Sequence, residues 1–180
     1  MLFTLLELFD MVVMTLAVGF IFMDLFSPPG EKFNKKAFLF AILVAAPAII
    51  LHEFGHKFVA LAFGYTATFH AAYLWLGIGV ALKLLRTGFI FFVPAYVSIG
   101  GAAVAGLPMS MTALAGPAVN GILFVTAFCV LKFSKPKGKT ALFWLVTRQI
   151  NGFLFIFNML PIPLFDGWKV YSGLFQWFGF

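Results

Sequence analysis

The sequence predicts a mainly α-helical membrane protein, with about four to five transmembrane helices and a small β-sheet or hairpin region between the second and third spans. Three observations predict this class. Of the 180 residues, 63% are hydrophobic and only 10% are charged, which excludes an ordinary soluble domain. Apolar runs near the ~20 residues that a bilayer requires alternate with short polar loops. One stretch between them lacks a helical period and is rich in aromatic and β-branched residues.

The basic residues indicate the partners of the chain, and the single cysteine limits its disulfide chemistry. The formal net charge is +6, but the lysines lie in short clusters between apolar runs. Such clusters are typical of topology signals and lipid-headgroup contacts, so we expect the lipid bilayer, and no nucleic acid, as a partner. Cys129 is alone, which rules out an internal disulfide, and it lies in a hydrophobic run where a small packing residue fits.

The first apolar run covers residues 1–26 and is predicted to be a retained span. It has no basic segment before it and no small-residue cleavage site, so it does not resemble a secretory signal peptide. Glu7 and Asp10 interrupt it, and we expect them to make interface or helix contacts instead of acting in catalysis. The break at residues 27–30 then leads into a lysine-bearing loop.

The second span, residues 37–63, carries a His-Glu-x-x-His sequence. On a helix His52 and His56 project from one face, about 6 Å apart, which suits two imidazoles bound to one zinc ion. Glu53 beside them can take a proton from a water whose pKa the zinc lowers towards roughly 7. Apart from Lys57, these are the span's only ionisable residues. A charge at membrane depth costs about 2.5–3.5 kcal/mol on insertion scales, which favours a metal site over polar residues at a helix interface.

Residues 64–101 are predicted to contain short strands. β-branched and aromatic residues concentrate at Thr66, Thr68, Phe69, Tyr73 and Trp75, and again at residues 89–93. We place a bend at Lys83 and Arg86. His70 lies outside any ligand spacing and is interpreted as a hydrogen-bonded structural residue.

Two further spans follow, at about residues 107–133 and 140–160. The third carries Gly116 and Pro117 near its middle, which indicates close packing or local unwinding. The fourth contains polar residues that need partners or water: Arg148, Gln149, Asn151 and Asn158. Residues 168–180 would form only about 20 Å of helix, which is short for another span.

Pro161 and Pro163 predict a helix break just after the fourth span. Non-helical backbone at membrane depth is tolerated only when protein buries it or it lines a wet cavity, so the break suggests a site. Asp166 follows the prolines and is the only acidic residue after Glu53. It can add one oxygen to the two histidines, leaving a fourth position on a catalytic zinc.

Together these motifs resemble the site-2 protease family of intramembrane zinc metalloproteases, in a compact form without a PDZ domain. The resemblance is carried by His52 to His56, by the Asn-x-x-Pro-x-Pro-x-x-Asp-Gly pattern that begins at Asn158, and by Gly116-Pro117-x-x-Asn120. The two longer motifs lie about 110 residues apart, each in an apolar run. The resemblance to this family covers roughly residues 37–168.

The resemblance implies roles for individual residues. His52, His56 and Asp166 would bind zinc, Glu53 would be the general base, and Asn120 would hold the substrate or stabilise the oxyanion. The chain would be a single integral membrane domain, residues 1–180, with residues 1–26 as an accessory span and 37–168 as the catalytic core. The segment between the second and third spans would form a small sheet that holds a transmembrane substrate as an added strand.

The positions of His52, Asn120 and Asn158 along their predicted helices are consistent with one shared site. Counted from the face that carries the lysine loops, His52, Asn120 and Asn158 lie roughly 22, 20 and 27 Å deep at 1.5 Å per residue. One layer could therefore hold all three, and Asn120 could then donate to an oxyanion. The alternative is that Asn120 bonds only to a neighbouring helix.

The function expected is regulated intramembrane proteolysis, in a multi-pass protein of a prokaryotic cell membrane. The alternative is a non-catalytic metal-binding membrane protein, either a transporter or a scaffold, which would have no need of Glu53. Orientation stays open, because the positive-inside rule places the lysine loops in the cytoplasm whereas the resemblance implies the reverse.

Overall fold

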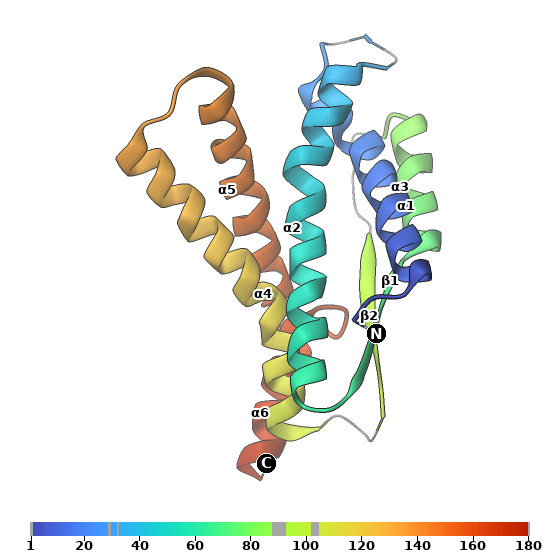
Figure 1. Ribbon diagram of the computed structural model, residues 1–180, viewed down its shortest axis with the longest axis vertical. Helices are drawn as coiled ribbons and strands as arrows, with labels where there is room; N and C mark the ends of the chain where they lie inside the picture. The colour runs from blue at the N-terminus through green and yellow to red at the C-terminus, as the bar shows by residue number, and fades with distance from the viewer. Residues whose placement is uncertain (1, 29, 32, 88–92, 102–104, 180) are drawn as a thin grey trace. The chain divides into compact units, whose positions relative to one another are not determined.

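The computed structural model is mainly helical and describes residues 2–28, 30–31, 33–87, 93–101 and 105–179 (Figure 1). Within these ranges four segments are long and apolar enough to cross a membrane: Leu5–Phe26, Lys35–Ala62, Gly106–Ser134 and Gly138–Asn158. A two-stranded antiparallel sheet, β1 (Thr66–Ala71) paired with β2 (Ala95–Gly100), lies between the second and third of them in the sequence. The predicted fold class is therefore confirmed.

The chain forms two compact units. The first comprises Met1–Ile50 with Thr68–Ser98, and the second comprises Leu51–Ala67 with Ile99–Phe180. Helix α2 (Lys35–Ala62) runs through both, and its second half carries the His-Glu-x-x-His motif. All three predicted zinc ligands, together with Glu53 and Asn120, consequently belong to the second unit.

In the first unit, helix α1 (Leu5–Phe22) covers one edge of β1. Thr4 and Glu7 form a capping box that starts this helix. Glu7 Oε1 accepts a hydrogen bond from the Phe69 amide at 2.8 Å, and Asp10 Oδ2 accepts one from the Ala71 amide at 3.1 Å. Amides of alternate strand residues point to the same side, so the two carboxylates satisfy the edge of β1 that β2 does not pair with. The two acids thus bond the backbone of a strand, whereas the sequence predicted groups near the interface or a helix contact.

The prediction of a strand through Tyr73 and Trp75 was wrong. These residues begin helix α3 (Tyr73–Leu84), which packs beside α1 in the same unit. Glycine and aromatic residues obscure the helical period of this segment. A helix nevertheless satisfies the backbone hydrogen bonds of an apolar segment internally, which a short exposed strand cannot do. The Tyr73 hydroxyl donates to Asp10 and holds the start of α3 against α1.

Three other predictions concern the segment between the second and third spans: the bend at Lys83, the second strand and the role of His70. Lys83 lies in the last turn of α3, where its ammonium bonds Asp24 at 3.0 Å; it is not at a bend between strands. Of the second predicted strand, residues 89–92 lie outside the described residues, and Val93 precedes β2. His70 is a hydrogen-bonded structural residue, as predicted, with Nε2 2.9 Å from Ser98 Oγ.

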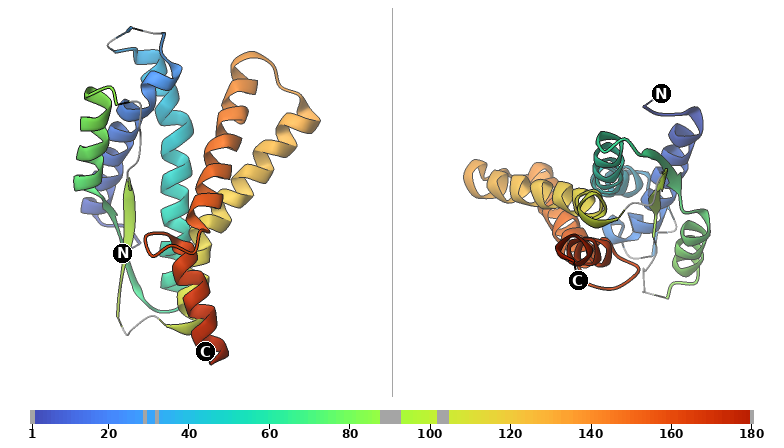
Figure 2. Two further views of the ribbon diagram at one scale, coloured as in Figure 1. Left: turned by 180° about the vertical axis from the view of Figure 1, so that it is seen from behind. Right: turned by 90° about the horizontal axis from the view of Figure 1, so that it is seen from below.

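The second unit is built on α4 (Gly106–Cys129), which continues into a π-helical turn, η2 (Val130–Ser134). Helix α5 (Gly138–Asn158) returns beside α4, so the predicted third and fourth spans form a helical hairpin (Figure 2). Helix α6 (Asp166–Phe178) then packs along α4. The backbone of α6 comes so close to α4 that a Cβ on Gly173 would lie 2.4 Å from Ser110 Oγ.

Candidate metal centre

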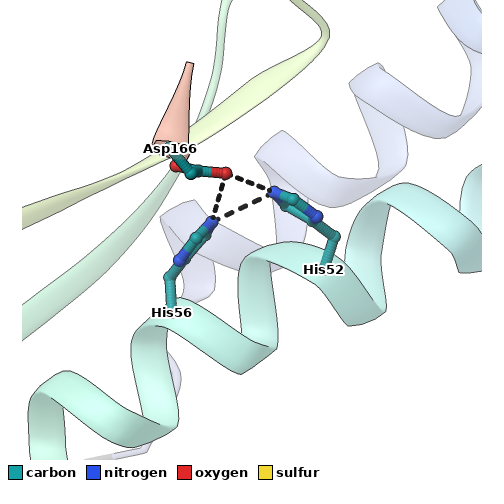
Figure 3. A group of neighbouring side chains, drawn as sticks. All are labelled: His52, His56 and Asp166. Atoms are coloured by element: carbon teal, nitrogen blue, oxygen red, sulfur yellow. Dashed lines mark hydrogen bonds and ion pairs between the residues drawn. The ribbon is translucent and has the colours of Figure 1, made fainter. Parts of the chain in front are cut away.

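Three donor atoms converge where the sequence predicts the zinc ligands. His52 Nε2 and His56 Nε2 are 3.0 Å apart, and Asp166 Oδ2 lies 3.2 Å from the first and 3.3 Å from the second. Figure 3 shows both imidazoles projecting from one face of α2 towards the carboxylate. Both histidines are buried, and the carboxylate is partly buried. Residues more than 100 positions apart are thus brought into one small triangle.

The triangle has the dimensions of a zinc site. With metal–ligand bonds of 2.0–2.1 Å, two ligands of a tetrahedron lie about 3.3 Å apart, close to all three separations here. Neutral imidazole nitrogen and a carboxylate oxygen are ligands that zinc accepts, and three protein ligands leave a fourth position open. The residues present therefore fit zinc in the arrangement of a catalytic site.

Helix α4 needs a glycine opposite the histidines. A Cβ on Gly116 would lie 2.3 Å from His56 Nε2 and 2.7 Å from His52 Nε2, inside the space of the ligand atoms. Gly55 on α2 is equally constrained, because its Cβ would lie 2.6 Å from the Ala115 carbonyl oxygen. The sequence predicted close packing or local unwinding near Gly116. Helix α4 is continuous there and packs closely, because a side chain on Gly116 would collide with the ligand atoms of both histidines.

The predicted helix break places Asp166. Helix α5 ends at Asn158 and α6 begins at Asp166, with both prolines in the connection. Gly167 lets this connection fold back, since its Cβ would lie 2.5 Å from the Met159 carbonyl carbon. The Tyr171 hydroxyl donates to the Met159 carbonyl at 3.0 Å. These contacts fix the first turn of α6, and with it the carboxylate that faces the histidines.

Glu53 is beside the triangle and is not part of it. Its side chain is 7% exposed, and it interacts electrostatically with His52, His56, Asp166 and Lys169. A carboxylate in this position can exchange a proton with a group at the open ligand position. The two histidines and Asp166 form the candidate donor set, and Glu53 lies outside that set.

Asn120 lies in the same layer as His52, as the helix lengths predicted. Its Oδ1 is 2.5 Å from His52 Nδ1, and its Nδ2 donates to Asn151 Oδ1 at 2.8 Å. Both ends of the Asn120 amide are therefore engaged inside the protein, where this side chain is fully buried. In the sequence, Asn151 is only one of several polar residues that need a partner, and nothing there assigns it to the site.

Comparison with known proteins places the chain in a family. A protein of Methanocaldococcus jannaschii named "Putative zinc metalloprotease MJ0611" is 36% identical over 166 residues, which is 91% of this chain and 82% of that protein. The chain belongs to the zinc metalloprotease family. A Mycolicibacterium smegmatis protein named "Putative zinc metalloprotease Rip2" is 31% identical over 136 residues, which is 67% of this chain and 51% of the relative. Zinc is thus the cofactor, in agreement with the geometry of the His-His-Asp group.

Two other comparisons found nothing. No family model matches the chain, and no solved structure matches it.

Proposed function

We propose that this zinc metalloprotease is an intramembrane endopeptidase of the site-2 type, which hydrolyses a peptide bond within or near the transmembrane segment of a membrane-anchored substrate. One observation carries the proposal: two of the three donor atoms belong to α2, a 28-residue helix long and apolar enough to cross a bilayer. A protease that keeps its metal ligands on such a helix is suited to substrates that are themselves in the membrane. We place the chain, as a multi-pass protein, in a prokaryotic cell membrane.

In this proposal His52, His56 and Asp166 hold the zinc ion. When bound, zinc supplies Lewis-acid chemistry, lowering the pKa of water and polarising a carbonyl oxygen. Glu53 accepts the proton of the attacking water through its carboxylate and then delivers it to the nitrogen of the leaving amine. Gly116 keeps the space beside the two imidazoles clear, and the buried surroundings of Glu53 limit competing water.

The substrate must be unwound before it can be cut, because a transmembrane helix hides each peptide bond in its own hydrogen bonds. Addition of the unwound segment to a sheet edge would give its backbone new partners. On β1 one edge is paired with β2 and the other is occupied by Glu7 and Asp10. We therefore assign the substrate to the outer edge of β2.

The experiment compares membrane proteomes from cells that carry the wild-type protein or its Glu53→Gln variant. Protein termini that depend on the wild-type protein should fall within or next to transmembrane segments. Termini found only in soluble domains, or none at all, would contradict the proposal. The non-catalytic alternative, a zinc transporter, predicts zinc flux into proteoliposomes that both variants support equally, and the same two proteins test it.

A further inference from the structure

A metal-binding histidine must present a bare nitrogen, and its other nitrogen decides whether it does. His56 Nδ1 lies 2.8 Å from the Thr112 carbonyl oxygen. A carbonyl can only accept, so this nitrogen carries the hydrogen and Nε2 keeps its lone pair for the metal. The tautomer of His56 is thus fixed directly by the backbone of α4.

The tautomer of His52 is fixed less directly, through two asparagines. Asn151 Nδ2 donates to the Thr147 carbonyl at 2.8 Å, and this backbone acceptor decides which way the Asn151 amide points. Asn151 Oδ1 must then accept from Asn120 Nδ2, which turns Asn120 Oδ1 towards His52 Nδ1. Each link sets the orientation of the next, so His52 Nδ1 carries the hydrogen and Nε2 is bare.

We propose that Asn151 and Asn120 form a positioning relay, in which α5 and α4 together hold His52 in its zinc-binding tautomer and ring orientation. Asn120 is 0% exposed and Asn151 is 1% exposed, so water cannot replace either partner. Losing such outer partners of a metal-bound histidine typically weakens metal affinity by 10–100-fold. The proposal concerns zinc binding and does not depend on the proposed proteolysis.

The relay gives Asn120 a different role from that of an oxyanion donor. An oxyanion donor acts through an amide hydrogen aimed at the substrate, whereas the relay acts through Oδ1 on His52 and through one Nδ2 hydrogen on Asn151. The two roles predict different zinc affinities. A relay residue changes zinc binding before any substrate is present, and an oxyanion donor leaves it unchanged.

The first test is Asn151→Leu, measured as the zinc Kd and as the visible spectrum of the cobalt(II)-substituted protein. The matched control is Gln149→Leu, which removes an exposed polar side chain from the same helix. We expect a roughly 10–100-fold weaker zinc Kd and an altered cobalt spectrum for Asn151→Leu, with the control equal to wild type. Wild-type affinity and spectrum in Asn151→Leu, even with a lowered Tm, would overturn the relay.

The second test compares Asn120→Asp with Asn120→Leu and covers the case in which Asn151→Leu fails to fold. A carboxylate at position 120 can still accept from His52 Nδ1, as carboxylates do beside many zinc-bound histidines, whereas leucine cannot. The relay predicts zinc affinity within a few-fold of wild type for Asn120→Asp and a loss of about 10-fold or more for Asn120→Leu. Equal affinity in both variants, whether retained or lost, would overturn the proposal.

Discussion

At the residue scale, Asp166 is the candidate ligand that joins distant parts of the sequence, and its removal should lower the zinc content of the protein. Asp166 Oδ2 closes the triangle with both imidazoles. Asp166→Ala leaves two ligands, so zinc content after purification should fall well below stoichiometric and activity should fall with it. Metal analysis beside a cleavage assay checks this. Full zinc occupancy in the variant would remove Asp166 from the ligand set.

Gly116 offers a test that depends on a single methyl group. In Gly116→Ala the new Cβ would lie 2.3 Å from His56 Nε2, so the imidazole or α4 must move. We expect zinc affinity to fall by at least about tenfold, as for other disturbances of ligand orientation. Gly121→Ala, on the same helix, is the control, because its Cβ would meet only the Phe155 ring at 3.4 Å. If both variants bind zinc like wild type, the site is more adaptable than this geometry allows.

Much of the site could be predicted from the residues, and the rest depended on partners that a sequence does not reveal. The helical spacing of His52 and His56 predicts that both side chains lie on one face. Ionisable groups in an apolar span are energetically costly, which indicates a functional site. Helix length placed Asn120 at the depth of His52. Depth does not say which way a helix faces, however, so the bond between Asn120 and Asn151 could not be inferred. The Asn120 amide also contacts Asn151 on a neighbouring helix, a partner that the sequence does not reveal.

At the element scale, the spans were predictable and the segment between them only partly so. A long apolar run in a bilayer must satisfy its backbone hydrogen bonds internally and therefore forms a helix. Helices α2, α4 and α5 accordingly begin and end close to their predicted limits. Helix α3 has only 12 residues and is rich in glycine and aromatic residues, so its helical period is weak and the sequence predicts a strand over its first residues. Of the strand predicted through Thr66, Thr68, Phe69, Tyr73 and Trp75, only the part within Thr66–Ala71 is a strand.

Proline scanning along β2 tests the proposed substrate edge. Alternate backbone amides of β2 point towards β1, and the others point outward. Proline at the outward positions of Ala95–Gly100 should impair cleavage at least tenfold while zinc content and Tm stay near wild type, because only a donor to the substrate is lost. Val97→Ala, which keeps its amide, serves as the control. Full cleavage by every stably folded proline variant would exclude strand addition at β2.

At the scale of the whole molecule, zinc should couple the second unit into one cooperative structure. His52 and His56 come from α2 and Asp166 from α6, so the ion would link the two helices within that unit. A ligand at a hundred times its Kd stabilises the native state by about 2.7 kcal/mol. Chelation should therefore lower the Tm of the wild-type protein, by on the order of 5 °C. Asp166→Ala should show little further drop with chelator, and an equal drop in both proteins would mean that the effect does not come from this site.

The central claim, that this zinc metalloprotease cuts membrane-anchored substrates with Glu53 as its base, is tested most directly by Glu53→Gln. The purified wild-type and variant proteins are reconstituted with a membrane-anchored substrate found in the proteomic comparison, and zinc content and cleavage are measured on the same samples. Gln keeps the size of the side chain but cannot carry the proton, so we predict near-stoichiometric zinc and no detectable cleavage. Substantial cleavage by the zinc-loaded Gln variant would contradict the account.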